Sequence, residues 1–189
     1  MGEISRRVES IVSTLASYEI DVSVVTFHDT LRGLEKKGGA EIHRVGNPIE
    51  PHLNILTWNL TLATEFERIV SDIYYSTRGG IDLIDAHEWL SVISATKIKK
   101  ALGTPFTYTL YSLEEQRSKY TASPLNMSIR NFEHLGLTEA SKIIVGSEWM
   151  KSEVETLHHI PSGRITLILP ESPTWVPQLV KVYQEASAR

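Results

Sequence analysis

Short runs of β-branched and apolar residues alternate along this chain with longer segments whose apolar residues recur at helical spacing. The runs lie at residues 21–27, 81–84, 106–110, 142–145 and 165–169. Segments near 3–17, 60–74, 90–102, 125–135 and 150–157 separate or flank them. Strands that alternate with helices favour a mostly parallel sheet with right-handed crossover connections. We therefore expect an α/β fold with a doubly wound, mostly parallel sheet.

Other segments give weaker signals. Residues 31–39 are rich in charge and end in the turn signal Gly38-Gly39, and residues 40–45 alternate weakly, which predicts a second strand near a sheet edge. Residues 46–58 are predicted to form a loop, and residues 174–187 a C-terminal helix that packs back on the rest. A chain of 189 residues is long enough for one full core, so we expect residues 1–189 to form a single domain.

Charge and composition exclude several classes of protein. The formal net charge is -4, so no basic field attracts nucleic acid or anionic lipid, and neither partner is expected. The chain has no cysteine, no apolar run of membrane-spanning length and no signal-peptide pattern at its start. These features predict a soluble, cytoplasmic protein without disulfides.

The segment Asp85-Ala86-His87-Glu88-Trp89 follows the apolar run 81–84 and precedes a helical pattern. In open α/β sheets, ligands bind outside the carboxyl ends of the strands. His87 is therefore the main candidate for a functional residue. The alternative is a strand-end histidine that hydrogen-bonds a neighbouring loop.

Four segments in this order carry a resemblance to a known family. They are residues 82–89, 105–114, 129–136 and 140–150, and the similarity extends over roughly residues 2–170. The chain resembles the N-terminal, acceptor-side domain of GT-B glycosyltransferases of the glycogen and starch synthase kind, which is Rossmann-like. It departs from the family pattern at Asp85 and Tyr111, where the family usually has His, and at Glu88, where it has Asp.

The resemblance implies roles for particular residues. His87 would contact the donor sugar in a cleft between two domains, and Gly2 would be what is left of a glycine-rich loop near the donor phosphates. Residues at the ends of two neighbouring strands would line the acceptor groove: Glu88, Tyr111, Ser112, Glu114 and Arg117. A polar strand-end loop without function is the alternative for this last group. Transfer of this kind needs no bound metal, and we expect no cofactor.

No segment resembles the family's donor-binding second domain, which holds the cationic groups that neutralise a diphosphate leaving group. We therefore expect a domain that is not catalytic alone. Three hypotheses follow: an acceptor-side domain that works with a donor-binding domain in trans, a non-catalytic module that binds an α-glucan or another glycan, or a protein that self-associates through the exposed interdomain face.

The family's first strand is also unmatched. In the doubly wound order that strand is central, so a gap is expected between the strands at Val22 and Leu83. Either those strands pair directly, or another segment fills the gap, or upstream sequence belongs there.

Overall fold

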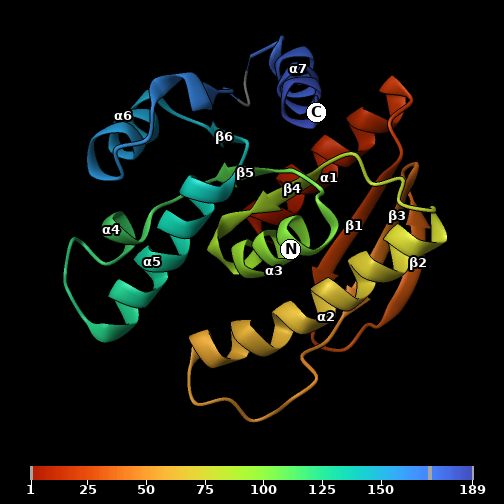
Figure 1. Cartoon of the computed structure of the whole chain (residues 1–189), viewed down its shortest axis with the longest axis horizontal. Coiled ribbons are helices and arrows are strands. Elements are labelled where there is room, and N and C mark those ends of the chain that lie inside the picture. Colours follow the sequence, from red (N-terminus) through yellow and green to blue (C-terminus); the bar gives the residue numbers. More distant parts are fainter. Residues whose placement is uncertain (1, 170–171, 189) are drawn as a thin grey trace.

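Four parallel strands form the central sheet in the computed structural model, which describes residues 2–169 and 172–188 (Figure 1). Their order is β4 (Ile84–His87), β5 (Phe106–Leu110), β6 (Lys142–Val145) and β7 (Ile165–Leu167). The predicted bounds of β5 and β6 are confirmed. β4 begins three residues later than predicted, so His87 is its last residue and not a residue of the loop beyond it.

A second sheet contains three strands in the order β1 (Val22–Phe27), β3 (Ala40–Val45) and β2 (Gly33–Lys37). β1 and β3 are parallel, and β2 is antiparallel to β3. Gly38 and Gly39 turn the chain between β2 and β3 with left-handed φ angles of 61° and 82°, which glycine adopts without steric cost. β2 was not predicted because all its residues are exposed and it has no buried apolar face. The predicted strand at residues 40–45 is β3, which lies next to the edge strand β2.

The helices follow the predicted order, with differences at their ends. Asn54 caps α2 by accepting hydrogen bonds from the N–H groups of Leu56 and Thr57, so this helix begins before the predicted residue 60. Within the described ranges no helix is long and apolar enough to cross a membrane. The bounds are α1 (Glu3–Leu15), η1 (Ala16–Tyr18), α2 (Ile55–Ser76), α3 (Glu88–Leu102), α4 (Glu114–Arg117), α5 (Pro124–Glu139), α6 (Glu148–Leu157), η2 (Ser162–Arg164) and α7 (Trp175–Ser187).

The larger core lies between the four-stranded sheet and the helices α3, α5 and α6. Phe106, Tyr108 and Leu110 point to this side of β5, as alternate residues of a strand must. Gly136 lets α5 come close, because a Cβ atom there would lie 2.7 Å from both Tyr108 and Val92. The close packing of α5 on α3 and β5 therefore depends on this glycine.

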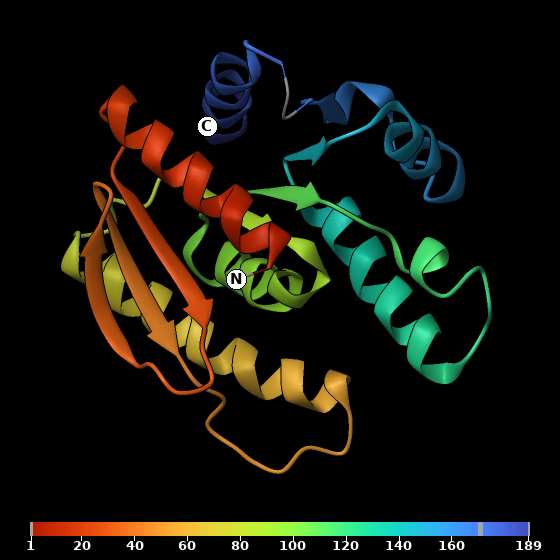
Figure 2. The same ribbon diagram turned by 180° about the vertical axis from the view of Figure 1, so that it is seen from behind.

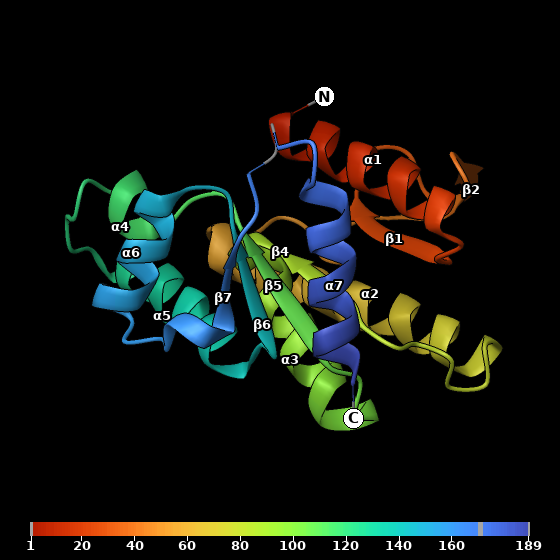
Figure 3. The ribbon, with the colours of Figure 1, turned by 90° about the horizontal axis from the view of Figure 1, so that it is seen from above.

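A smaller core covers the opposite face of the sheet, under α1 and α7 (Figure 3). It contains Ile144, Ile168, Leu179 and Val182, with Ile11 of α1 packed against them. α7 crosses β5 on this face and brings the polar side chain of Tyr183 to the strands. Helices thus cover both faces, and the predicted α/β, doubly wound, Rossmann-like fold is confirmed.

The sheet is divided, however. β1 and β4 each end their own sheet, and no strand pairing joins them among the described residues. A gap was predicted here, and one explanation was that the strands at Val22 and Leu83 pair directly. That explanation is wrong, because β1 and β4 do not pair. Figure 2 shows the two sheets side by side, with α1 packed over the region between them.

Candidate functional site

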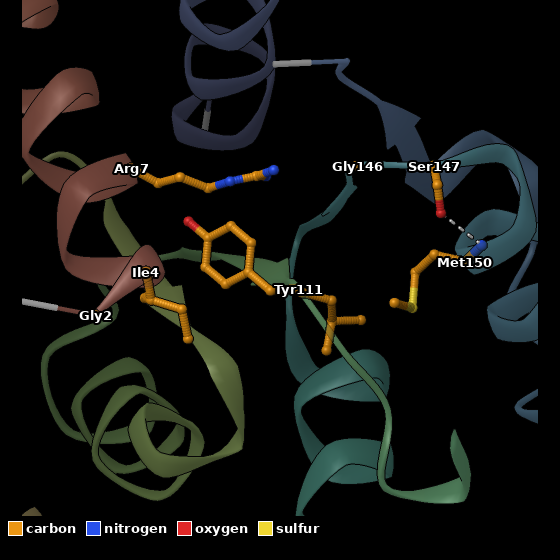
Figure 4. Close-up of a pocket in the computed structure, with 8 residues that line it drawn as sticks. Gly2, Ile4, Arg7, Tyr111, Gly146, Ser147 and Met150 are labelled. Carbon is orange, nitrogen blue, oxygen red and sulfur yellow. Dashed lines mark hydrogen bonds between the residues drawn. The ribbon is translucent and has the colours of Figure 1, made fainter. Parts of the chain in front are cut away.

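A pocket of about 510 Å³ opens where the carboxyl ends of β5 and β6 meet the first turns of α1 (Figure 4). This volume lies in the range of small-molecule sites. Ile4, Leu110 and Met150 supply apolar surface, and Tyr111 and Arg7 supply polar groups. The full lining is Gly2, Ile4, Arg7, Leu110, Tyr111, Gly146, Ser147 and Met150.

Tyr111 lies at the centre of this lining. It directly follows β5, and the Cζ atom of Arg7 lies 5.4 Å from the centre of its ring, within the range of a cation–π contact. Burial raises the pKa of Tyr111, and the nearby carboxylate of Asp85 raises it further, so the side chain stays a neutral hydroxyl. It can therefore both donate and accept a hydrogen bond at the pocket.

His87, the last residue of the neighbouring strand β4, hydrogen-bonds the hydroxyl of Tyr111. Its Nδ1 lies 2.8 Å from the Tyr111 oxygen, and the two rings stack with their centres 5.8 Å apart. The register explains the contact, since His87 is the partner of Thr109 in the parallel pair and Tyr111 lies two residues further along. The imidazole therefore supports Tyr111 and is not itself among the residues that line the pocket.

Asp85 binds the other ring nitrogen of His87. Its Oδ2 lies 3.1 Å from Nε2, and the hydroxyls of Thr107 and Thr109 donate to Oδ1 at 3.0 and 2.7 Å. Tyr183 of α7 donates a further hydrogen bond to Oδ2. Both carboxylate oxygens of Asp85 and both ring nitrogens of His87 are thus occupied.

These contacts determine the protonation of Asp85 and His87. Burial alone would raise the pKa of Asp85 and lower that of His87, because it disfavours both charged forms. Their mutual attraction and the hydrogen bonds reverse both effects, so the pKa of Asp85 is lowered and that of His87 is raised. A protonated His87 donates from Nδ1 to the Tyr111 oxygen, which leaves the hydroxyl hydrogen of Tyr111 available to a ligand.

A second network fixes the chain that follows Tyr111. Oε1 of Glu88 accepts hydrogen bonds from the N–H groups of Tyr111 at 2.6 Å and Ser112 at 3.0 Å. Glu88 adopts a left-handed φ of 58°, which is unfavourable for a residue with a Cβ atom. Strain of this kind persists only where surrounding contacts enforce it, and the bonds of the Glu88 carboxylate provide them.

Arg117 is the centre of that network. Its guanidinium contacts Glu133 at 2.6 Å, Glu114 at 3.0 Å and Glu88 at 3.5 Å, and it donates to the Ser112 hydroxyl at 2.6 Å. Glu133 is fully buried and also accepts from the N–H of Glu114. Burial raises the pKa of Glu133 to about 7, although the bonds from Glu114 and Arg117 act in the opposite direction.

The predicted site residues thus divide into three groups. Gly2 and Tyr111 line the pocket, and His87 lies next to it in contact with Tyr111. The remaining predictions lie together in the network around Arg117 and do not line the pocket: Glu88, Ser112, Glu114 and Arg117.

Other residues of the site were not predicted. Strand alternation places Asp85 on the same side of β4 as His87, and this signal could have identified it. Arg7 and Tyr183 reach the site only through the packing of α1 and α7, and no local pattern marks them.

Comparisons with known proteins agree with this fold. A sucrose-phosphate synthase of Thermosynechococcus elongatus superposes with a TM-score of 0.68 at 16% identity, over 96% of this chain and 94% of that one. UGT89C1 of Arabidopsis thaliana, solved in complex with UDP-L-rhamnose, gives a TM-score of 0.56 at 16% identity, over 86% of this chain and 45% of that one. At this identity the likeness shows the fold, which is that of GT-B glycosyltransferases.

Sequence relatives lead to the same family. An uncharacterized glycosyltransferase of Methanocaldococcus jannaschii is 25% identical over 148 residues, which cover 78% of this chain and 37% of the relative. The uncharacterized glycosyltransferase YqgM of Bacillus subtilis is 28% identical over 147 residues, or 71% of this chain and 40% of the relative. The chain therefore spans less than half the length of these curated relatives. The model of the glycosyl transferase 4-like domain matches residues 2–171, and the chain belongs to that family.

Proposed function

We propose that the pocket is the acceptor side of a glycosyl-transfer cleft and that Tyr111 is its principal hydrogen-bonding residue. The observation that carries the proposal is the line of contacts from Asp85 through His87 to the Tyr111 hydroxyl at the mouth of the parallel sheet. This line keeps a neutral hydroxyl fixed among apolar side chains, an arrangement suited to the hydroxyl groups and apolar ring faces of a sugar. An α-glucan is the first acceptor to test.

His87 has a supporting role in this proposal. It was expected to contact the sugar itself, but its two nitrogens already bind Asp85 and Tyr111. In this proposal His87 orients the Tyr111 hydroxyl. Through that hydroxyl it also stabilises negative charge that develops on a bound oxygen. Gly2 would let a ligand approach the main chain at the start of α1.

Transfer itself would also require a donor-binding domain. When an acceptor hydroxyl attacks the anomeric carbon, the bond to the nucleoside diphosphate breaks, and the leaving group needs cationic partners. Among the described residues that line the pocket, Arg7 is the one cation. This favours a domain that binds acceptor but does not catalyse alone, and it keeps a glycan-binding module as the second candidate. A cytoplasmic location remains a prediction from the absence of cysteine.

The test is a calorimetric titration of maltoheptaose against the wild-type chain and Tyr111→Phe. Loss of one hydrogen bond of about 1 kcal/mol should weaken binding roughly fivefold. Tyr75→Phe is the matched control, because Tyr75 is 73% exposed at the end of α2 and should bind as the wild type does. No binding by the wild type, or equal binding by Tyr111→Phe, would count against the assigned role.

The two candidate functions differ in a second assay. Wild-type chain mixed with a separately produced donor-binding domain and a nucleotide sugar should transfer glycosyl groups to the bound glycan if the acceptor-side role is correct. Binding without transfer by any such mixture would leave the glycan-binding module as the function.

A further inference from the structure

A second pocket lies beside the three-stranded sheet, between β2, β3 and the middle of α2. Its volume is about 470 Å³, and it shares no lining residue with the pocket at Tyr111. Figure 2 shows α2 behind this sheet. Asn47 holds the loop after β3 against α2, because its side chain donates to the main-chain oxygen of Trp58 and accepts from the hydroxyl of Thr61. Strand, loop and helix thus border a space of the size of a small-molecule site.

Strand alternation determines which side chains face this pocket. Phe27 of β1 contacts Trp58 of α2 with ring centres 4.9 Å apart, so this side of the sheet faces α2. Val45 is the partner of Phe27 in the parallel pair, and His43 lies two residues before it on the same face. Arg44 points to the opposite face, where it forms an ion pair with β2. His43 therefore points toward α2 and the pocket, and the side chain of Arg44 does not.

The imidazole of His43 lacks a hydrogen-bond partner. Its Nε2 atom is buried and forms no hydrogen bond with any described residue. The carboxylate of Glu41 lies 3.9 Å away, which is too far for a hydrogen bond, and is paired with Lys36 at 2.9 Å. Buried polar atoms nearly always have a partner, so this nitrogen indicates a group that enters the pocket. A hydrogen on Nε2 would be donated to an acceptor atom of that group.

Arg32 brings a positive charge to the same pocket. Its guanidinium donates to the main-chain oxygens of His28, Asp29 and Leu31, and it has no carboxylate partner within the described ranges. It lies against Gly46, where a Cβ atom would overlap it. These contacts use three of the five guanidinium donors, so two remain for a ligand.

The other charges at the pocket compensate one another. Glu65 contacts Arg68 at 2.9 Å, so these two lining residues form an ion pair. Asp72, 3.1 Å from Arg68, lies outside the lining and is 67% exposed, so solvent screens its charge. The charge of Arg32 is thus left in excess within the lining, which favours an anion.

We propose that this pocket binds a small organic anion with an apolar body. The oxygens of the anion accept hydrogen bonds from Nε2 of His43 and from Arg32. The apolar body lies on Leu34 and Ile69, which line the pocket; Leu34 is 55% exposed and is the strand partner of His43. This site is separate from Tyr111, so the proposal does not depend on the glycosyl-transfer role.

The first arm of the test uses benzoate as the probe and benzyl alcohol as its neutral counterpart. NMR of the isotope-labelled wild-type chain should show saturable shifts of the His43 ring nitrogens and of the Leu34 and Ile69 amides with benzoate. Benzyl alcohol should bind about tenfold more weakly, because it lacks the charge. Inorganic phosphate, which has no apolar body, should also bind more weakly than benzoate. Equal binding of the three probes, or no saturable shift with benzoate, would overturn the proposal.

The second arm uses variants. Arg32→Gln and His43→Phe should each weaken benzoate binding about tenfold. Lys37→Gln is the matched control: it removes a positive charge from the same sheet, but on the opposite face, where Lys37 contacts Glu9 of α1 at 2.6 Å. Because Arg32 also holds the loop after β1, the urea midpoint of each variant is measured, and His43→Phe tests the site with that loop intact. Wild-type affinity in His43→Phe, or an equal loss in Lys37→Gln, would overturn the proposal.

Discussion

Tyr183 in α7 donates a hydrogen bond to Oδ2 of Asp85 in β4, 98 positions earlier in the chain. The bond links the last described helix to the strand that carries His87. Burial, and the negative charge of Asp85, raise the pKa of Tyr183 far above its ordinary value, so it acts as a neutral donor. α7 is thus a part of the site and not only a cover for the sheet.

Removing the Tyr183 hydroxyl should lower the stability of the folded protein. Tyr183→Phe keeps the ring in place but removes one hydrogen bond to a buried carboxylate, which is worth about 1.5–3 kcal/mol. We expect the free energy of unfolding in urea to fall by roughly that amount. Tyr75→Phe, at an exposed ring, should change it by less than about 0.5 kcal/mol. A Tyr183→Phe variant as stable as the wild type would show that the bond contributes nothing.

Asp85→Asn should lower the pKa of His87. Burial lowers this pKa, and the charge and hydrogen bond of Asp85 raise it more than the charge of Glu88 does, so removal of the Asp85 carboxylate leaves burial dominant. NMR titration of the imidazole protons checks the shift. Asp82→Asn, at an exposed aspartate of the same segment, is the matched control and should leave the titration unchanged. A His87 pKa that rises or stays constant in Asp85→Asn would contradict the assignment.

The pair of Asp85 and His87 should make the stability of the protein depend on pH. The folded pKa of His87 is raised, so its contribution is complete below about pH 6.5 and is lost as pH rises through the folded pKa. The folded pKa of Asp85 is lowered, so its contribution is complete above about pH 4 and is lost as pH falls through the folded pKa. The difference in unfolding free energy between wild type and Asp85→Asn should therefore be largest between these limits. A difference that grows above pH 8 would argue against a charged pair.

Glu133→Gln tests the buried carboxylate in the network around Arg117. Burial raises the pKa of Glu133 from an ordinary 4.5 to about 7, so the folded state binds a proton in this interval that the unfolded state has released. Stability from this group is complete below pH 4.5 and is lost as pH rises through 7, a change on the order of 3 kcal/mol.

The stability of Glu133→Gln should not fall between pH 4.5 and 7, because the amide cannot titrate. The variant retains a carbonyl that can accept from the N–H of Glu114. Glu139→Gln, in the same helix, should retain the fall in stability, since Lys99 lowers the pKa of Glu139 below the interval. Urea unfolding at pH 4.5, 6 and 8 measures how the stability of each variant depends on pH. An unchanged slope in Glu133→Gln would assign the pH dependence to other groups.

Gly136→Ala should destabilise the contact of α5 with the sheet. The added Cβ atom would lie 2.7 Å from both Tyr108 and Val92, so these side chains or the helix itself must shift, at a cost of about 1–3 kcal/mol. Gly163→Ala is the control, because nothing lies within 4 Å of a Cβ atom there. Equal unfolding free energies for the two variants would mean that the helix adapts without cost.

The sequence predicted elements best where burial is uniform. β5 and β6 are short apolar runs between clear helical segments, and their bounds agree with the structure. β2 could not be found this way, because its charged residues are exposed and its stability comes from pairing with β3. The division of the sheet was anticipated as a gap, but only the structure shows that β1 and β4 do not pair.

The site was predicted in location more than in detail. The carboxyl ends of parallel strands were predicted to hold the site, and Tyr111 and Gly2 line the pocket at that edge of the sheet. Side-chain direction was not predictable, since the orientation of Glu88 depends on its left-handed φ and its bonds to the chain after β5. Distant partners such as Tyr183 depend on how α7 crosses the sheet, which no local pattern encodes.

The charged strand β2 has a consequence for behaviour in concentrated solution. Glu35, Lys36 and Lys37 stand on the outer edge of their sheet, and charges of both signs there discourage the edge-to-edge stacking that leads to aggregates. At the opposite outer edge, β7 is only three residues long and offers little length for pairing. Within the described residues, both outer edges are thus protected against adding copies of the chain, and growth of fibrils by strand addition is disfavoured.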